Sequence, residues 1–247
     1  MTRLFSMAAA ATAIALTPAC AQSQVDAADK EAIEKIVYEY IMENPEIIED
    51  ALIALSEKRA AEEAELAMAA IADNQDALIN NPDDFSVGPA DAPVTVVEFF
   101  DYRCGFCKRS AEWATQLPEK YDNKVRVVFK EFPILSTESE KAAQAAIAAG
   151  KQGKYLEMHM ALMELDNGSG FGPEAIDAAA ESVGVDVAKM RADMKSIPVQ
   201  KAVADAKSLA RTLNITGTPN FIIGNEMVSG ADTQRVEALI EAALAES

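Results

Sequence analysis

The sequence has few basic side chains. Its 247 residues include 22 Lys and Arg against 40 Asp and Glu, which gives a formal net charge of −18 at neutral pH. Proteins that bind nucleic acid need clustered Lys and Arg to neutralise phosphates, so this composition argues against a nucleic-acid partner. Half of the residues are hydrophobic and a quarter are charged, which is typical of a folded globular protein.

No hydrophobic run is long enough to cross a bilayer. The run at Ala8–Leu16 has nine residues, whereas a transmembrane helix needs roughly 20. It follows a charged start and precedes Ala19-Cys20-Ala21, a small-x-small cleavage pattern, so we predict a secretory signal peptide over residues 1–21. Lipidation of Cys20 is the alternative, but Thr17 stands where a lipoprotein signal normally has a branched aliphatic residue. We therefore expect a periplasmic protein that is not anchored by lipid.

Cysteine is scarce, with three residues in the whole chain. Secreted domains that are held together by disulfides are shorter and much richer in cysteine. Cleavage after Ala21 would remove Cys20 and leave only Cys104 and Cys107. We therefore expect these two cysteines to have a local chemical role.

Two amphipathic helices are predicted after the signal peptide. Apolar residues recur at spacings of three and four from Asp29 to Glu43, and Asn44-Pro45 then ends this helix and starts another. From Ser56 to Glu65 the large apolar residues give way to Ala, Glu, Lys and Arg, which indicates an exposed helical linker. The two helices either dock on the rest of the chain or associate with other copies. The polar linker favours association, so we predict an oligomerisation module with its linker over residues 22–81.

Mixed α/β patterning begins after a boundary at Asn80–Asp84. Val94–Phe100 and Val125–Phe129 have the β-branched and aromatic composition of strands, and Lys108–Lys120 between them is helical. A block of helices then follows over about residues 136–213, and a hairpin and a last helix complete the chain. The predicted helices of the block start near Thr137, Tyr155, Pro173, Val187 and Val199, the hairpin strands are Phe221–Ile223 and Met227–Val228, and the last helix is Asp232–Leu244.

Cys104-Gly105-Phe106-Cys107 lies between the first of these strands and the following helix. The helix N-terminus offers unpaired N–H groups and a positive dipole end, which lower a thiol pKa from about 8.5 into the range of roughly 3.5–7.5. Arg103, Lys108 and Arg109 add positive charge nearby. We expect Cys104 to be the attacking thiolate and Cys107 to resolve the mixed disulfide.

Metal binding and an inert disulfide are the alternatives for this pair. A closed zinc site needs four ligands, and the chain has no second cysteine pair and a single histidine. Copper(I) needs only two soft thiolates, so copper at Cys104 and Cys107 stays open. No cofactor is expected.

The segment Ala92–Cys107 resembles the active-site segment of the disulfide-bond protein A (DsbA) family. Phe129–Pro133, the helical block and Thr216–Phe221 resemble further parts of these proteins, so that the likeness covers roughly residues 82–247. The resemblance implies a thioredoxin-like α/β domain over residues 82–247, interrupted by a helical insertion, with thiol–disulfide oxidoreductase activity.

Further site residues follow from this resemblance. Pro219 is implied to be a cis-proline facing the cysteines, which leaves the backbone of Thr218 free to pair with an extended substrate. Gly105 and Phe106 are expected to contact substrate as well. Glu98 is implied to be a buried acid that passes protons to and from Cys107. Lys130 is implied to be its partner, with a surface lysine as the alternative.

The dipeptide between the cysteines favours one activity within the family. Strong oxidases of the DsbA family usually carry histidine there, whereas Gly105-Phe106 with Thr218 before the proline is similar to oligomeric disulfide isomerases. With the N-terminal helices, the chain looks most like the suppressor of copper sensitivity C (ScsC) proteins, in which such helices are implied to form a trimer. The hypothesis is a periplasmic disulfide isomerase or reductase that acts on misoxidised exported proteins and receives electrons from a membrane thiol reductase. A dithiol oxidase, or a copper-binding protein without turnover, is the alternative.

The single histidine and the nearby methionines are expected to be structural. His159 lies on a helix of the insertion, where we predict a surface or half-buried position. Met158, Met160 and Met163 have helical spacing and are expected to fill the core.

Overall fold

The computed structural model describes residues 27–168 and 171–246. The predicted signal peptide and Cys20 therefore lie outside the described residues. The chain divides into two compact units at Lys58–Arg59. No described helix is long and apolar enough to cross a membrane.

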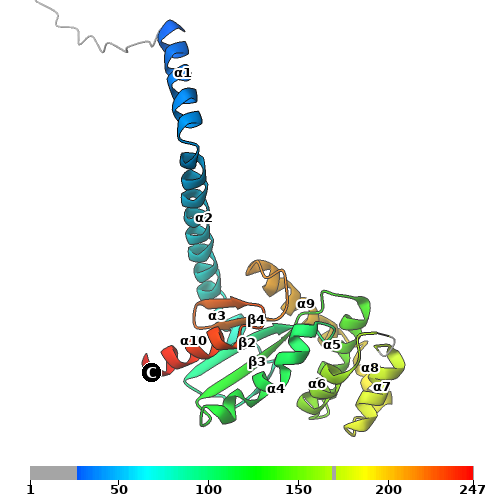
Figure 1. The fold of residues 1–247 in the computed structure, drawn as a ribbon. Helices are drawn as coiled ribbons and strands as arrows, with labels where there is room; N and C mark the ends of the chain where they lie inside the picture. Colours follow the sequence, from blue (N-terminus) through cyan, green and yellow to red (C-terminus); the bar gives the residue numbers. More distant parts are fainter. Residues whose placement is uncertain (1–26, 169–170, 247) are drawn as a thin grey trace, which may run out of the picture. The chain divides into compact units, whose positions relative to one another are not determined.

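Two exposed helices account for the described part of the first unit. Helix α1 (Ala27–Glu43) and the beginning of α2 (Glu46–Asp73) confirm the predicted helices and the break at Asn44-Pro45 (Figure 1). Their large apolar side chains are mostly exposed within this chain, among them Ile33, Ile36, Val37, Tyr40, Ile48, Leu52 and Leu55. Exposed apolar side chains that lie on neighbouring helices are typical of a surface that binds a partner.

The second unit is built on a five-stranded sheet with the order β1-β3-β2-β4-β5. Strands β2 (Val94–Phe100) and β3 (Val125–Glu131) are parallel, and the other neighbouring pairs are antiparallel. These two central strands are buried on both faces, which explains their continuous apolar sequences. The remaining strands are β1 (Phe85–Val87), β4 (Asn220–Ile223) and β5 (Glu226–Ser229).

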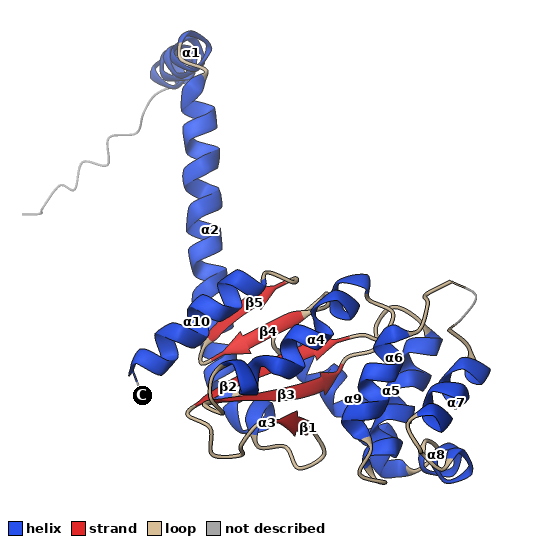
Figure 2. Ribbon diagram, turned by 60° about the horizontal axis from the view of Figure 1, so that its bottom comes forward, coloured by secondary structure: helices blue, strands red, loops and turns tan. Residues whose placement is uncertain are grey.

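Helices cover both faces of the sheet (Figure 2). On one face, α4 (Gly105–Lys120), α10 (Thr233–Glu246) and part of the helical insertion pack on alternate residues of β2 and β3, including Val96 and Phe129. On the other face, the C-terminal part of α2, α3 (Gln75–Ile79) and α9 (Ile197–Thr212) pack on the intervening residues, including Phe99. This arrangement is a DsbA-like thioredoxin fold.

The insertion lies between β3 and β4. It consists of α5 (Thr137–Gly150), α6 (Tyr155–Glu164), α7 (Pro173–Ser182), α8 (Val187–Asp193) and α9. Ser136 caps α5 by accepting a hydrogen bond from the backbone N–H of Ser139 at 3.1 Å. The alanine face of α5 is buried, because small side chains let its neighbouring helices approach closely.

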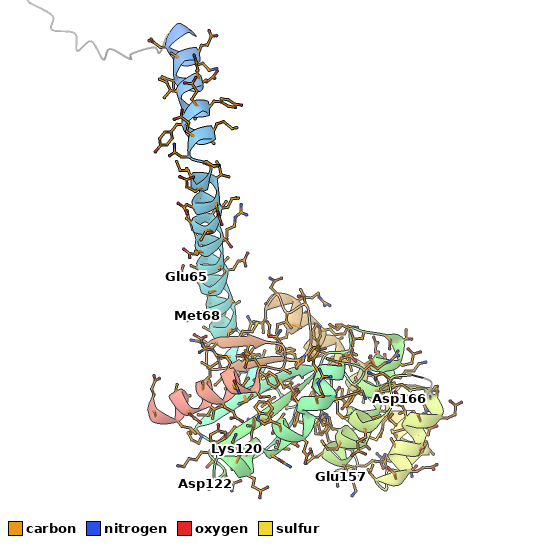
Figure 3. All side chains as sticks on the ribbon, viewed as in Figure 1. Glu65, Met68, Lys120, Asp122, Glu157 and Asp166 are labelled. Atoms are coloured by element: carbon orange, nitrogen blue, oxygen red, sulfur yellow. The ribbon has the colours of Figure 1, made fainter. Side chains whose placement is uncertain are left out.

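Ile71 and Leu78 extend the second unit toward the N-terminus. Both are fully buried in the core beside Val97 and Phe99, although they precede the expected boundary near residue 82. Helix α2 belongs to this unit from Arg59 onward, and Glu65 and Met68 are exposed side chains on this part of it (Figure 3). The polar stretch from Ser56 to Glu65 is helical, as predicted, and is exposed along its length.

Candidate active site

The Cys104 side chain caps the helix that follows β2. Cys104 is the N-cap of α4, and its Sγ accepts a hydrogen bond from the backbone N–H of Cys107 at 3.4 Å. The backbone N–H of Cys104 donates to the Asp101 carbonyl at 3.0 Å, which holds the turn between strand and helix. Cys104 is 6 % exposed, whereas Cys107 is completely buried, and neither forms a disulfide here. Only the first sulfur is therefore placed to meet another molecule.

The surroundings of Cys104 stabilise its anion and lower its pKa to about 5. The interaction with the Cys107 side chain contributes most, and hydrogen bonds from the Thr218 side chain and from the backbone of Cys107 and Phe106 add to it against the opposing effect of burial. The Thr218 carbonyl lies 3.2 Å from Sγ and accepts a hydrogen bond from the protonated thiol. Ionisation breaks that one bond, while the donors at the helix N-terminus remain.

Cys107 and Glu98 have pKa values shifted in the opposite direction. Burial raises the pKa of Cys107 far above its usual range, and the charges of Glu98 and Cys104 add to this effect. Burial, with the nearby Cys104 charge, raises the pKa of Glu98 to about 8. Glu98 is buried, as the sequence suggested, and its Oε1 has no hydrogen-bond partner among the described residues. An acid of this pKa beneath the cysteines can give or accept a proton near neutral pH.

Pro219 lies across from Cys104 at the start of β4. The Thr218–Pro219 bond is cis, and the Thr218 carbonyl lies against the Cys104 sulfur. Strand β4 pairs with β2 in antiparallel register, with Glu98 opposite Phe221, so the beginning of β4 meets the end of β2. The structure thus brings together the sequence-predicted Cys104, Cys107, Glu98, Thr218 and Pro219.

Gly105 and Phe106 form the first turn of α4, directly beside the reactive sulfur. The Phe106 ring is 58 % exposed, and the Arg109 guanidinium lies 4.4 Å from its centre. A Cβ on Gly105 would meet only the Arg109 side chain at 3.6 Å, so the surface there is open. An exposed aromatic ring next to Cys104 is suited to contact an apolar substrate.

Lys130 does not pair with Glu98, and the expected partnership is wrong. In the β2–β3 register Glu98 is opposite Phe129 and Lys130 is opposite Phe99, so the two side chains point to opposite faces of the sheet. Lys130 Nζ instead bonds the Asp84 carboxylate and donates to the Ala77 carbonyl at 2.6 Å. Nor is Lys130 a surface residue, because it is buried on the face covered by α3 and α9.

A buried polar cluster beside the active-site turn was not recognised from the sequence. Tyr102 and Tyr155 both donate to Glu131 Oε1 at 2.9 Å, and Tyr102 Oη lies 3.1 Å from His159 Nδ1. The tautomer of His159 decides which of these two atoms donates the hydrogen bond between them. Burial lowers the pKa of His159 to about 3, so the ring is neutral at pH 7. The cluster links the turn after β2 to β3 and to the insertion.

The predicted exposure of His159 is therefore wrong. Its ring is 1 % exposed and lies against Phe100 and Phe129, because α6 packs directly on the sheet. Met158 and Met163 are buried in the same core, which confirms their structural role, and Met160 is partly buried against it. No group of three or more His, Cys, Asp or Glu side chains suited to holding a metal occurs within residues 27–168 and 171–246.

Lys108 also connects the site to the insertion. Its Nζ donates to the carbonyls of Met163 and Leu165 at 3.0 and 2.6 Å, at the C-terminal end of α6. The last carbonyls of a helix have no hydrogen-bond donor within that helix, and the ammonium group of Lys108 supplies one. Lys108 is thus committed to joining α4 to α6, and it is not free to pair with substrate.

Comparison with known proteins agrees with this geometry. The DSBA-like thioredoxin domain family matches residues 95–241, which is more than half of the chain. The chain belongs to the DSBA-like thioredoxin domain family. The Cys104–Cys107 pair lies within the matched residues. A second family, the copper resistance protein ScsC N-terminal domain, matches residues 29–62.

Solved structures similar to this DsbA-like chain include two bacterial proteins. A linker-deletion mutant of Proteus mirabilis ScsC is 27 % identical, covers 92 % of this chain and 100 % of its own, and superimposes with a TM-score of 0.67. A thioredoxin-like oxidoreductase from Silicibacter pomeroyi is 36 % identical, covers 69 % of this chain and 97 % of its own, and has a TM-score of 0.64. The resemblance to ScsC proteins is confirmed.

Some curated relatives of this DsbA-like chain are much longer. Na⁺/H⁺ antiporter NhaA 1 of Salinispora arenicola is 30 % identical over 154 residues, which are 62 % of this chain and 23 % of the antiporter. The chain spans about a quarter of the length of the first curated relatives that it matches. What the whole antiporters do therefore carries no conclusion for this chain.

Proposed function

We propose that this protein is an exported thiol–disulfide oxidoreductase that isomerises and reduces wrongly paired disulfides in other exported proteins. The observation that supports thiol–disulfide exchange is the opposite shift of the two thiol pKa values, to about 5 for Cys104 and far above the usual range for Cys107. One sulfur is a ready nucleophile, and the other stays protonated until a disulfide has been captured.

The reaction begins when the Cys104 thiolate attacks a client disulfide. A Cys104–client disulfide forms, and the second client sulfur leaves as a thiolate. In isomerisation this thiolate attacks another disulfide of the client, and the client eventually displaces Cys104. In reduction the Glu98 carboxylate takes the Cys107 proton, and the Cys107 thiolate attacks the Cys104 sulfur. The client is then released with both cysteines reduced, and the enzyme keeps the new disulfide.

A donor of two electrons must then reduce the Cys104–Cys107 disulfide. A membrane thiol reductase is the partner that this cycle implies, since an isomerase has to be kept reduced. The clients are unfolded or misoxidised proteins in the periplasm. Support for export comes from the predicted signal peptide and from the periplasmic thioredoxin-like protein of Salmonella among the similar structures.

Copies of the chain associate through their N-terminal helices in this proposal, and a trimer is the favoured assembly. Support comes from the exposed apolar side chains of α1 and α2 and from the match of residues 29–62 to the ScsC N-terminal domain. Several active sites in one assembly would hold a client through more than one contact, which raises its effective concentration at each site.

A dithiol oxidase is the second candidate, and the low pKa of Cys104 favours it. Stabilising the thiolate stabilises the reduced enzyme, which makes its disulfide a stronger oxidant. A copper(I) site at Cys104 and Cys107 is disfavoured by the raised pKa of Cys107, because a thiol must lose its proton to bind a metal.

Refolding of scrambled ribonuclease separates these functions. The reduced protein is expected to restore ribonuclease activity from the wrongly paired form, in amounts well below the substrate and with a glutathione buffer as the electron source. The matched control is the Cys104→Ser variant, which should restore none. Rapid oxidation of reduced ribonuclease without recovery of the scrambled form would instead identify an oxidase.

A further inference from the structure

Arg109 is an exposed residue whose guanidinium lies over the two residues between the cysteines. It follows Phe106 by three positions on α4, a spacing that makes side chains neighbours on a helix surface. The guanidinium carbon lies 4.4 Å from the centre of the Phe106 ring. A Cβ on Gly105 would lie 3.6 Å from Arg109 Nη1, so the same group also reaches across Gly105. A substrate that approaches Cys104 therefore meets this cation beside the dipeptide.

The other two cations beside the cysteines already have partners. The Arg103 guanidinium donates to the Asn167 carbonyl at 2.9 Å and lies 3.6 Å from the Glu138 carboxylate. Lys108 donates to carbonyls at the end of α6. Within the described part of the chain, the Arg109 guanidinium forms no hydrogen bond and no ion pair. Its N–H groups are therefore available to another molecule.

Stacking on an aromatic ring prepares a guanidinium to bind an anion. The stacking interaction uses the face of the planar group and leaves the N–H groups at its edge available. Two parallel N–H groups of arginine match the two oxygens of a carboxylate, and contact with the ring limits the conformational freedom that the long side chain loses on binding. The N-terminal end of α4 adds a positive dipole end, which also favours a negative group. A carboxylate thus matches this position in both charge and shape.

We propose that Arg109 is a specificity-determining residue that binds a carboxylate on a client residue next to the disulfide under attack. The inference rests on the proposed function, because the carboxylate belongs to the client of that same site. The chain carries 40 acidic against 22 basic residues, so its overall charge repels acidic clients. Arg109 offsets this repulsion where the Cys104 thiolate meets the client. The site therefore accepts disulfides that are flanked by Asp or Glu.

The test compares two peptide disulfides that differ only in charge. Each is a symmetric dimer of an acetylated and amidated pentapeptide with a central cysteine, which is flanked on both sides by Glu in one dimer and by Gln in the other. The reduced protein converts each dimer into two peptide thiols and keeps the Cys104–Cys107 disulfide. Mass spectrometry of acid-quenched samples gives the second-order rate constant. The readout is the ratio of the rate constant for the Glu dimer to that for the Gln dimer.

In the Arg109→Gln variant this ratio should fall about fivefold, which corresponds to about 1 kcal/mol. The replaced side chain belongs to an exposed residue, so the core stays intact. A change in the reactivity of Cys104 itself would alter both rate constants by the same factor and would cancel in the ratio. The ratio therefore reports the contact with the carboxylate and not the state of the thiol.

Arg211→Gln is the matched control. Arg211 is exposed as well, and it lies on α9, which packs on the opposite face of the sheet from α4. Its replacement changes the net charge of the chain by the same amount. In this variant the ratio should keep its wild-type value.

An unchanged ratio in the Arg109→Gln variant would overturn the inference. An equal fall in the Arg211→Gln variant would overturn it too, because net charge alone would then explain the effect. Neither result affects the proposed function, which requires only that the wild type reduces the uncharged dimer. Failure of the wild type to reduce the Gln dimer would instead refute the proposed function.

Discussion

The Cys107→Ser variant is expected to accumulate mixed disulfides with its clients. Cys104 keeps its place at the N-terminus of α4 and still attacks a client disulfide. The serine hydroxyl cannot displace the client from the Cys104 sulfur, so resolution by the enzyme stops. Catalytic reduction should fall to the background rate, and non-reducing electrophoresis should show covalent complexes that disappear on addition of dithiothreitol.

The Cys104→Ser variant is the matched control for this experiment. The active-site cysteine that it retains, Cys107, is completely buried and has a raised pKa, so it should capture no clients. Trapping by the Cys104→Ser variant would assign the two cysteines the reverse roles. No trapping by the Cys107→Ser variant would show that the pair has no catalytic role.

The Ile33→Asn/Ile36→Asn variant is expected to separate isomerisation from reduction. Both side chains are more than half exposed on α1, and polar replacements remove apolar surface that another copy would cover. The variant should have the mass of a monomer by light scattering. Its recovery of scrambled ribonuclease should fall about tenfold or more, because several linked sites no longer act on one client. Its reaction with oxidised glutathione should stay unchanged.

Glu34→Gln/Lys35→Gln on the same helix is the control for this prediction. Each residue takes part in an exposed i,i+4 ion pair, and such pairs contribute little to stability. An unchanged mass of the Ile33→Asn/Ile36→Asn variant would refute self-association through α1. Equal losses in both variants would show that altering the helix, and not its apolar surface, causes the effect.

Sequence patterns were sufficient where the structure depends on local signals. The apolar run Val94–Phe100 is β2, and the cysteine pair after it begins α4, because burial of a parallel strand and capping of a helix act over a few residues. The cis form of Pro219 could be predicted only through the resemblance, since Thr-Pro alone is an ordinary turn signal.

Sequence patterns could not predict which side chains of neighbouring strands lie on the same face of the sheet. Glu98 and Lys130 lie on different faces because of the register of β2 and β3, and no sequence spacing fixes the register of strands separated by a helix. Strand β1 has only three residues, too few for a periodic signal, and it adds to the sheet through its pairing with β3. Asp84, the partner of Lys130, immediately precedes this strand.

The buried histidine illustrates the same limit. His159 lies between Met158 and Met160 on a short helix, and partial exposure was expected only because its ring is polar. It is buried because Tyr102 and Glu131, which are 57 and 28 positions earlier in the numbering, reach the same point of the core. A glutamate flanked by Lys130 and Phe132 at the end of an apolar strand was the available signal for this cluster, because a buried carboxylate requires donors nearby.

Titration of the Cys104 thiol in the reduced protein tests the central claim most directly. The rate of alkylation by iodoacetamide, or the ultraviolet absorbance of the thiolate, should follow one ionisation with a pKa of about 5. At pH 6 about nine-tenths of Cys104 should then be ionised, compared with less than about 1 % of an ordinary cysteine. A midpoint near that of free cysteine, about 8.5, would contradict the account, because the Cys107 side chain, Thr218 and the helix N-terminus would then not stabilise the attacking sulfur as an anion.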